Sequence, residues 1–302
     1  MKIYDIAIIG GGPAGLYAHY YANQKRFASI LIEANDELGG QPTILYPVKA
    51  IHDFPGKKSI QAKNLMNEFI KKAKYPTIVT GTTVKKIEQD NGCYQLVTNK
   101  EPIYAKFVII ATGGGFFKFN KIEGIESKKI HYCVKDLKVY KGKKVVICGG
   151  GDAAFDWAAE ILKRDLTNNL SIVHRRDEFR AAQCKIDCLK KFKYKTYLNK
   201  ASKVIADGKL EIVDKLTNKK EILPFDYLIV QYGQTYSLQD NQMLKPFNLD
   251  LQNRIKIDSN CRTNMGNIYA IGNVASYNDK PRLIHVAISD AKKAIDDILD
   301  HE

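Results

Sequence analysis

The fold is decided by residues 3–15, which read IYDIAIIGGGPAG. The first seven form a short, largely apolar run, as expected of a strand that is buried on both faces of a parallel sheet. The glycines that follow are spaced G-x-G-x-x-G. In this motif Gly10 allows a tight turn, Gly12 leaves room for a pyrophosphate, and Gly15 lets the next helix pack closely. The free N–H groups and positive dipole end of that helix favour phosphates. The stretch therefore predicts a dinucleotide-binding unit.

An acidic residue strengthens this interpretation. The next apolar run, residues 29–32, is followed by Glu33. The acceptor for a ribose hydroxyl is needed about 20 residues beyond the glycines, at the end of the second strand. The alternative is a glycine turn in an ordinary α/β unit, and Glu33 at this position favours the nucleotide site.

Composition sets the broad class. The chain has 302 residues, 45% hydrophobic and 26% charged, which is typical of a soluble globular protein with room for two domains. No apolar run is long enough to cross a membrane, and no signal peptide is recognised. Six scattered cysteines without a C-x-x-C pair predict a cytoplasmic protein with reduced thiols.

The charge predicts the kind of partner. A net charge of +14 indicates an acidic partner. The lysines are spread along the chain, and neither a zinc-ligand spacing nor a nucleic-acid-binding motif is present. We therefore expect no metal, no nucleic acid and no membrane among the binding partners.

Periodicity predicts the other elements. Residues 38–42 form a glycine-proline break, and residues 45–56 an ordered loop. Helices are expected over 60–74, 155–163 and 283–299. Strands are expected over the following ranges: 77–79, 83–87, 94–98, 107–111, 144–148, 170–173 and 227–230, with a strand and turn over 267–274.

The opening motif occurs a second time. Residues 149–154 read GGGDAA, a G-x-G-x-x-A motif after an apolar strand. Where the first unit has Glu33, the second has His174-Arg175-Arg176, with Arg180 one turn further on. Guanidinium groups pair bidentately with phosphate, whereas an acid would repel a 2′-phosphate. We therefore interpret the first unit as an FAD site and the second as an NADPH site. A solvated basic turn is the alternative.

These features predict an α/β protein with two nested, Rossmann-like, three-layer nucleotide-binding domains. The FAD domain is split, over 1–115 and 235–302, and the NADPH domain is inserted at 116–234. The Ala111-Thr112-Gly113 crossing and Gly272 near the end resemble those of thioredoxin reductase-like flavoproteins. Thioredoxin reductase carries a redox C-x-x-C before its second glycine motif. Here only Cys133 lies in that region, and disulfide reduction needs two thiols.

Further segments resemble the ferredoxin/flavodoxin–NADP⁺ reductases of the same fold. They are Gly39-Gly40-Gln41, Leu45-Tyr46-Pro47, His131-Tyr132, Asp136-Leu137, Gly149 to Ala154 with Asp156-Trp157, His174 to Asp177 with Phe179-Arg180-Ala181, and Tyr232-Gly233. By this resemblance Glu33 holds the adenosine ribose, Gln41 contacts FAD, and Tyr46 stacks on one flavin face. Val84 and Phe117 match other flavin contacts, and Arg175 and Arg176 would bind the 2′-phosphate.

The motifs and the resemblance together imply two sets of cofactor residues. The FAD set is Gly10, Gly12, Pro13, Ala14, Gly15, Glu33, Gly40, Gln41, Tyr46, Val84, Ala111, Thr112, Gly113, Phe117, Gly272 and Asn273. The NADPH set is Gly149, Gly151, Asp152, Ala153, His174, Arg175, Arg176 and Arg180.

The sequence departs from the family pattern at two places. The family has Gly-Asp near its end, with the acid on the flavin ribityl chain, whereas this chain has Gly272-Asn273. Asn can accept a hydrogen bond through its carbonyl oxygen but brings no charge. The reductase branch usually extends beyond its last helix to cover the second flavin face, so we expect that face to be open or covered differently here. His301 is expected to be a frayed terminal residue rather than a stacking group.

The resemblance implies that NADPH passes a hydride to the flavin, which then releases single electrons. The cofactor does the chemistry, so no side chain is predicted to be catalytic. The implied partner is an acidic ferredoxin or flavodoxin, and the family is commonly homodimeric. Two alternatives stay open. Cys184 and Cys188, one helical turn apart, could form a redox pair or bind metal in a disulfide reductase, or the chain could be a redox-sensing flavoprotein.

Overall fold

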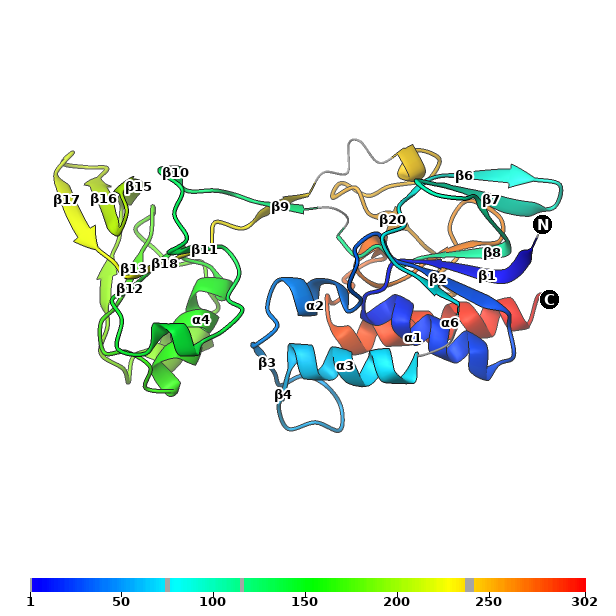
Figure 1. Ribbon diagram of the computed structural model, residues 1–302, viewed down its shortest axis with the longest axis horizontal. Helices are drawn as coiled ribbons and strands as arrows, with labels where there is room; N and C mark the ends of the chain where they lie inside the picture. The colour runs from blue at the N-terminus through cyan, green and yellow to red at the C-terminus, as the bar shows by residue number, and fades with distance from the viewer. Residues whose placement is uncertain (1, 74–76, 115–116, 237–241) are drawn as a thin grey trace. The chain divides into compact units, whose positions relative to one another are not determined.

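The computed structural model describes residues 2–73, 77–114, 117–236 and 242–302. The chain divides into two compact units (Figure 1). Unit 1 is Met1–Phe117 with Tyr236–Glu302, and unit 2 is Lys118–Thr235. The chain crosses between them along β9 (Phe117–Phe119) and β19 (Gln234–Tyr236), which pair with each other.

Unit 1 is built on a mixed sheet. Its strands, in the order β5-β2-β1-β8-β7-β6, have the following bounds: β5 (Ile78–Val79), β2 (Ser29–Ile32), β1 (Ile3–Ile9), β8 (Ile103–Ile110), β7 (Cys93–Thr98) and β6 (Val84–Asp90). The first four run parallel, β7 pairs antiparallel with β8, and β6 pairs antiparallel with β7. The carboxyl half of β8 also pairs in parallel with β21 (Ile268–Ala270).

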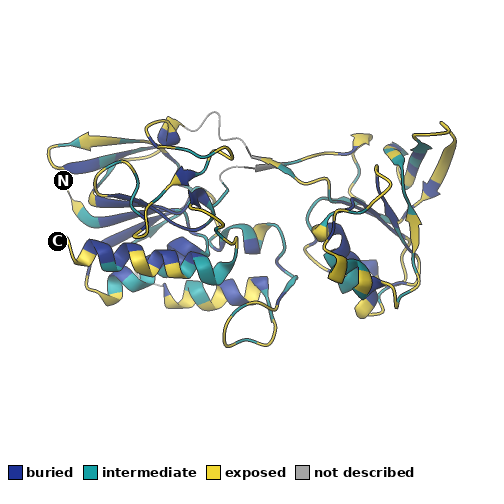
Figure 2. Cartoon of the chain, turned by 180° about the vertical axis from the view of Figure 1, so that it is seen from behind, coloured by how far each residue is buried: buried dark blue, intermediate teal, exposed yellow. Residues whose placement is uncertain are grey.

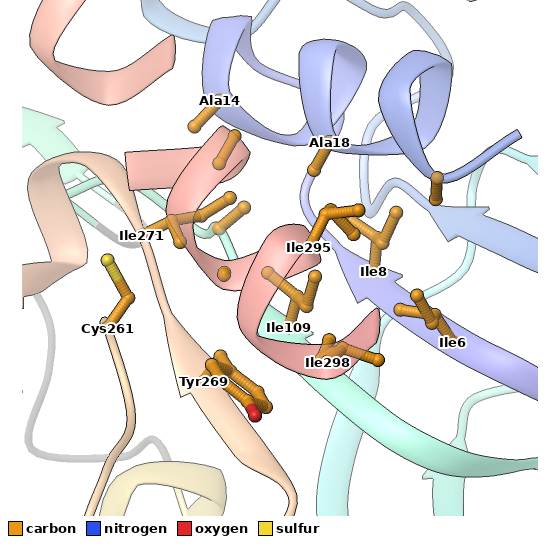
Figure 3. Close-up of a cluster of buried hydrophobic side chains, with 14 of the residues drawn as sticks. Ile6, Ile8, Ala14, Ala18, Ile109, Cys261, Tyr269, Ile271, Ile295 and Ile298 are labelled. Atoms are coloured by element: carbon orange, nitrogen blue, oxygen red, sulfur yellow. The ribbon is translucent and has the colours of Figure 1, made fainter. Parts of the chain in front are cut away.

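Both faces of this sheet are covered. Helices α1 (Pro13–Gln24), α3 (Ala62–Lys72) and α6 (Ile284–Leu299) lie along one face (Figure 1). Ile6 and Ile8 of β1 pack there against Ala18 and Ile295 (Figure 3). Ala7, the intervening residue, packs on the opposite face in a second cluster. The second cluster contains Met243 and Leu244 of η2 (Gln242–Leu244), Ile255 of β20 (Ile255–Lys256), and Ala275 of β22 (Ala275–Ser276). Strand β1 is therefore buried on both faces, as the sequence predicts.

Unit 2 repeats the parallel architecture. Its five parallel strands, in the order β11-β18-β12-β13-β14, are β11 (Ile130–His131), β18 (Tyr227–Val230), β12 (Val145–Cys148), β13 (Leu170–Val173) and β14 (Lys195–Tyr197). Helices α4 (Asp152–Lys163) and α5 (Gln183–Leu189) follow β12 and β13. Val146 and Cys148 pack against a second sheet formed by β10 (Glu123–Gly124), β15 (Lys200–Ala206), β16 (Lys209–Asp214) and β17 (Lys220–Pro224). In each unit the central parallel strands are largely buried, and the outer sides of the helices are exposed (Figure 2).

The structure differs from the sequence predictions at several boundaries, and it contains strands that the sequence does not predict, β14 to β17 among them. The predicted break at 38–42 contains the start of α2 (Gly40–Ile44), and Pro42 lies in its first turn, where a missing N–H costs no helical hydrogen bond. Helix α4 begins at Asp152, three residues before the predicted start, because Gly151 already occupies the N-cap. The predicted loop contains β3 (Ala50–Ile51), which pairs with β4 (Ile60–Gln61). The chain also contains two short 3₁₀ turns, η1 (Lys138–Tyr140) in unit 2 and η3 (Gly272–Val274) in unit 1.

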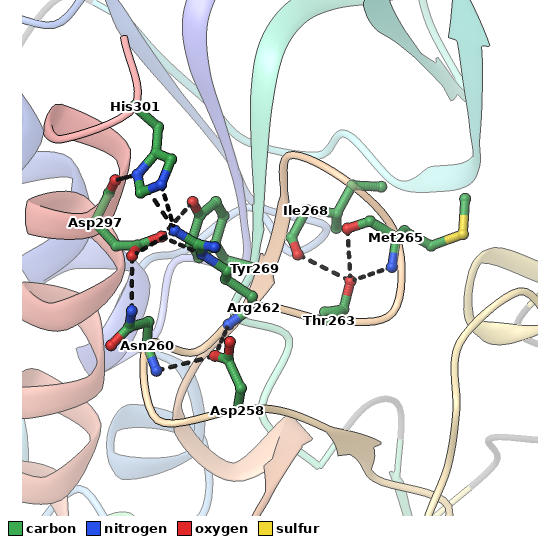
Figure 4. Close-up of polar contacts among 9 residues, drawn as sticks. All are labelled: Asp258, Asn260, Arg262, Thr263, Met265, Ile268, Tyr269, Asp297 and His301. Carbon is green, nitrogen blue, oxygen red and sulfur yellow. Dashed lines mark hydrogen bonds and ion pairs between the residues drawn. The ribbon is translucent and has the colours of Figure 1, made fainter.

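A polar cluster fixes the carboxyl end of α6 (Figure 4). The buried carboxylate of Asp297 accepts two hydrogen bonds from the Arg262 guanidinium, at 2.6 and 2.8 Å, and one from the Tyr269 hydroxyl at 2.7 Å. His301 donates from Nδ1 to the Asp297 carbonyl oxygen, at 2.7 Å, and accepts at Nε2 from Arg262, at 2.8 Å. The prediction that His301 is a frayed residue is therefore wrong, because its ring joins this cluster.

Asp297 gives a stability prediction. Its replacement in Asp297→Ala leaves the buried Tyr269 hydroxyl without its acceptor, so we expect the free energy of unfolding to fall by about 1–3 kcal/mol. Urea unfolding measures the change. The control Lys292→Ala removes an exposed ion pair with Asp296 on the same helix and should leave the midpoint unchanged. An unchanged midpoint in Asp297→Ala would contradict the structure of this cluster.

The wild type and Asp297→Ala also give a prediction about the pH dependence of stability. Burial alone would raise the pKa of Asp297, but hydrogen bonds from Arg262 and Tyr269 hold it below its ordinary value. A carboxyl with a lowered folded-state pKa stabilises the fold above its unfolded pKa of about 4, and this stabilisation disappears as the pH falls through the folded-state pKa. The stability difference between the wild type and Asp297→Ala should therefore be constant near neutrality and shrink in acid.

Candidate functional site: two glycine loops, one in each unit

The first glycine loop joins β1 to α1 with very close packing. Gly10 has φ +113°, and a Cβ there would lie 2.5 Å from the Ala111 carbonyl oxygen. A Cβ on Gly15 would overlap the carbonyl oxygen of Gly10. At Gly12 the space is open, since the nearest atom is the Gly40 Cα at 3.9 Å. The loop is therefore held rigidly from behind, while its middle faces a pocket.

That pocket lies within unit 1 at the carboxyl ends of β1, β2 and β8. Of the predicted FAD residues, those that line it are Gly10, Gly12, Pro13, Ala14, Glu33, Gly40, Gln41, Tyr46, Val84, Ala111, Thr112, Gly113, Gly272 and Asn273. Gly15 lies behind the loop. Phe117 begins β9, but its side chain lies outside the part of the chain that is described. Residues from five distant segments of the sequence thus meet in one cavity.

Other lining residues were not predicted from the sequence. They are Ile9, Ile32, Ala34, Asn35, Pro42, Ile44, Thr82, Thr83, Met243, Arg282, Leu283, Ile284 and Ala287. Asn35 follows Glu33 by two residues and could have been found from that spacing. Arg282 and Leu283 directly precede α6, and Ile284 and Ala287 lie in its first turn; only the way this helix packs beside α1 brings them to the pocket.

Glu33 lines the pocket and also closes the glycine loop. Its side chain is buried, and Oε2 accepts a hydrogen bond from the Gly11 N–H at 2.6 Å. Oε1 accepts from the Asn35 backbone N–H and side-chain amide, at 2.8 and 2.7 Å. A carboxylate has about four acceptor sites, so one stays available to a ligand hydroxyl. Glu33 therefore has a structural role beside the predicted binding role.

The pocket contains an unsatisfied polar atom. The Thr112 Oγ1 is buried and has no hydrogen-bond partner among the described residues. Buried hydroxyls in native proteins are rarely left unpaired. Thr112 lines the pocket, so its hydroxyl is suited to a polar group of a ligand bound there. The open space at Gly12, the N-terminus of α1 and this hydroxyl all fit a phosphate-containing cofactor such as FAD.

The second glycine loop has the same design in unit 2. Gly149 has φ +151°, and a Cβ there would lie 2.7 Å from the Gln231 carbonyl oxygen. The space at Gly151 is open, with nothing within 4 Å. Asp152 begins α4, and its Oδ1 accepts from the Ala182 N–H at 2.8 Å. Ala153 follows it and is exposed.

The predicted arginines lie beside this loop. The Gly150 carbonyl oxygen accepts from the backbone N–H groups of Arg180 and Ala181, at 2.7 and 3.1 Å. Arg175, Arg176 and Arg180 are exposed, and no acidic side chain of the described residues forms an ion pair with them. Three guanidinium groups are thus available to an anion next to the loop.

His174 occupies a different position from the arginines. It is buried, and its ring lies directly against Gly150, where a Cβ would approach it to 2.5 Å. The ring stacks on Phe179, which packs edge-on against Phe155 of α4. Burial and the nearby Arg180 lower the pKa of His174, so the ring is neutral at pH 7. His174 supports the loop from behind.

All six cysteines lie within the described ranges, and none of them forms a disulfide with another. Cys184 and Cys188 lie on α5, the first exposed and the second partly buried. Burial raises the pKa of Cys133, which makes it a poorer nucleophile. Within the described ranges, no three His, Cys, Asp or Glu side chains gather as a metal site. In the same ranges, every helix is too short or too polar to span a membrane.

Comparison with known proteins gives a family and a fold. Residues 4–291 match the pyridine nucleotide-disulphide oxidoreductase family. The chain is 38% identical to the ferredoxin–NADP reductase of Malacoplasma penetrans, over 98% of this chain and 96% of that protein. It is 37% identical to ferredoxin–NADP reductase 2 of Bacillus subtilis, over 97% and 91%. The solved thioredoxin reductase of T. acidophilum superposes with a TM-score of 0.82 at 24% identity, over 100% of this chain and 99% of that one.

The two loops give a matched pair of variants. Gly12→Ala places a methyl group in open space, so we expect the protein to fold normally but to be purified without bound FAD, because the methyl group occupies the room for the pyrophosphate. Gly151→Ala makes the same change in unit 2 and should retain FAD. Absorbance at 450 nm per chain measures both. Full FAD occupancy in Gly12→Ala would contradict this placement of the pyrophosphate.

Proposed function

The chain belongs to the pyridine nucleotide-disulphide oxidoreductase family, and from this premise we propose that it is an NADPH-dependent ferredoxin reductase. Relatives that match over nearly the whole chain bear the name ferredoxin–NADP reductase. The solved thioredoxin reductases support the fold alone. One observation carries the proposal: the chain has two glycine loops that differ in the side chain packed against them. Glu33 contacts the loop of unit 1, and His174 contacts the loop of unit 2 and is followed by Arg175 and Arg176.

The cofactors are FAD and NADPH, one for each unit. When bound, FAD takes an electron pair as hydride from NADPH and passes electrons on singly. We assign FAD to the pocket of unit 1, where Gly12 and the N-terminus of α1 meet the pyrophosphate and Glu33 meets the adenosine ribose. Tyr46 supplies a ring to stack on the flavin, and Asn273 supplies an uncharged amide.

NADPH is assigned to unit 2. Its pyrophosphate would lie at Gly151 and the N-terminus of α4, where the space is open. Arg175 and Arg176 would hold the 2′-phosphate. This is supported by their exposure, and by the Arg176 carbonyl oxygen, which accepts a hydrogen bond from the Asn199 N–H at 2.9 Å and so fixes the backbone there. No acid, base or nucleophile from the chain is needed, since these residues bind and orient the reactants.

The partner is an acidic one-electron carrier, ferredoxin or flavodoxin. Of the net charge of +14, unit 2 contributes +10, from 25 basic and 15 acidic side chains. Such an excess accelerates encounter with an acidic protein. We further propose that the protein is a homodimer, because it resembles a family that is commonly dimeric. We also propose a cytoplasmic location, because none of the six cysteines forms a disulfide with another.

One comparison tests which protein accepts the electrons. FAD-loaded protein is mixed anaerobically with NADPH and, in separate samples, with ferredoxin, flavodoxin or thioredoxin. We expect reduction of ferredoxin or flavodoxin and none of thioredoxin. Reduction of thioredoxin alone, lost in Cys184→Ser/Cys188→Ser, would replace this proposal with a disulfide reductase.

The arginines give a specificity prediction. Charge-assisted hydrogen bonds are worth about 1.5–3 kcal/mol, so Arg175→Ala/Arg176→Ala should raise the KM for NADPH by about 10- to 100-fold and leave the KM for NADH unchanged. Ferricyanide reduction measures both without a protein partner. Arg164→Ala, which removes an exposed arginine that is paired with Glu160 in the same unit, is the control and should change neither value. Equal losses with both nucleotides would count against the 2′-phosphate site.

Asn273 gives a redox prediction. A carboxylate introduced at the pocket by Asn273→Asp opposes the addition of electrons to a nearby flavin. We expect the two-electron potential of bound FAD to fall by about 30 mV, which corresponds to about 1.4 kcal/mol. Redox titration of the flavin checks this. Asn278→Asp, an exposed change in the following loop, should leave the potential unaltered. A shift that is no larger than in this control would contradict the position given to Asn273.

A further inference from the structure

Gly272 is the point at which the carboxyl-terminal segment meets the first glycine loop. It begins the η3 turn with φ +69°, and a Cβ there would lie 3.0 Å from the Cβ of Ala14 in the first turn of α1. Gly272, its neighbour Asn273, and Ala14 all line the pocket of unit 1. A small displacement of this turn would therefore change the shape of the pocket at the place where α1 presents its N-terminus.

Two buried charges hold this one residue from both sides. Asp290 of α6 accepts the Gly272 N–H at Oδ2, at 3.0 Å. Lys280, in the segment before α6, donates from Nζ to the Gly272 carbonyl oxygen at 2.6 Å. The two side chains form an ion pair of 2.6 Å with each other, and each is only 3% exposed. The result is a closed ring of three polar contacts around Gly272.

Stability alone does not account for such a pair. Burying two charges costs desolvation energy that their mutual attraction often fails to exceed, and a well-packed apolar pair of similar size is frequently as stable. An apolar pair could not form hydrogen bonds with Gly272. The N–H of Gly272 needs an acceptor and its carbonyl oxygen needs a donor, and the Lys280–Asp290 pair supplies both in fixed positions.

We propose that Lys280 and Asp290 are positioning residues for the cofactor: they fix the Gly272-Asn273 turn so that the uncharged Asn273 meets FAD. Neither side chain is among those that line the pocket, so both act through Gly272. The inference rests on the proposed assignment of FAD to unit 1. It adds a role for an ion pair that links the start of η3 to α6.

The test removes both charges together. In Lys280→Met/Asp290→Leu no charge is left unpaired, so the apoprotein should fold. The Gly272 turn loses both polar contacts, and we expect a lower melting temperature for that reason. We expect the Kd for FAD, measured on apoprotein by quenching of flavin fluorescence, to rise about tenfold or more, the order of effect of outer-shell partners at metal sites. A Kd within about twofold of the wild type would overturn the proposal.

A matched control lies on the same helix. Arg262→Met/Asp297→Leu removes the ion pair at the other end of α6 (Figure 4), and neither residue is among those that line the pocket. It should lower the melting temperature and leave the Kd for FAD unchanged. An equal loss of FAD affinity in this control would mean that any loosening of α6 weakens binding, and would also overturn the proposal.

A variant with a smaller change of shape keeps the proposal testable if the first double variant does not fold. Lys280→Met/Asp290→Asn leaves no buried charge unpaired and retains an oxygen for the Gly272 N–H, but it removes the donor to the Gly272 carbonyl oxygen. We expect a folded protein with weaker FAD binding, and an unchanged Kd would overturn the proposal. Failure of the wild type to bind FAD would instead contradict the proposed function itself, so the two failures are distinguishable.

Discussion

The structure of unit 1 depends on how closely α1 approaches the end of β1. Only glycine at position 15 lets the helix begin against the carbonyl of Gly10, and only glycine at position 10 lets that turn pass beneath Ala111. This contact directs the first N–H groups of α1 into the pocket. It also places Ala14 beside Gly272, so the amino- and carboxyl-terminal parts of the chain complete one cavity.

The two glycine loops differ in what fills the space behind the middle glycine. In unit 1 a Cβ on Gly11 would meet the Glu33 side chain, whose carboxylate binds the Gly11 N–H. In unit 2 a Cβ on Gly150 would meet the ring of His174. The residue that follows the second strand therefore supports the loop in both units. It is an acid that faces the pocket in unit 1, and a neutral histidine in unit 2. Because the histidine is buried, the arginines after it are directed to the exposed side, where a phosphate can reach them.

The sequence predicts most of this architecture because glycine spacing and apolar runs are local signals. The strands β1, β2, β12, β13 and β18 lie where periodicity places them, and the predicted FAD residues largely meet in one pocket. Contacts that depend on tertiary packing could not be predicted in this way. Arg282 reaches the pocket only through the packing of α6, and the Lys280–Asp290 pair joins residues with no motif of their own. His301, judged from its terminal position alone, is instead fixed by Arg262.

We propose that one chain binds a flavin in unit 1 and a phosphorylated pyridine nucleotide in unit 2, and transfers electrons between them. The decisive measurement is an anaerobic titration of the FAD-loaded protein. We expect the 450 nm absorbance to be lost with one equivalent of NADPH per bound flavin, and NADH at the same concentration to bleach it far more slowly. A protein that cannot be loaded with FAD, or a loaded flavin that NADPH leaves oxidised, would contradict it.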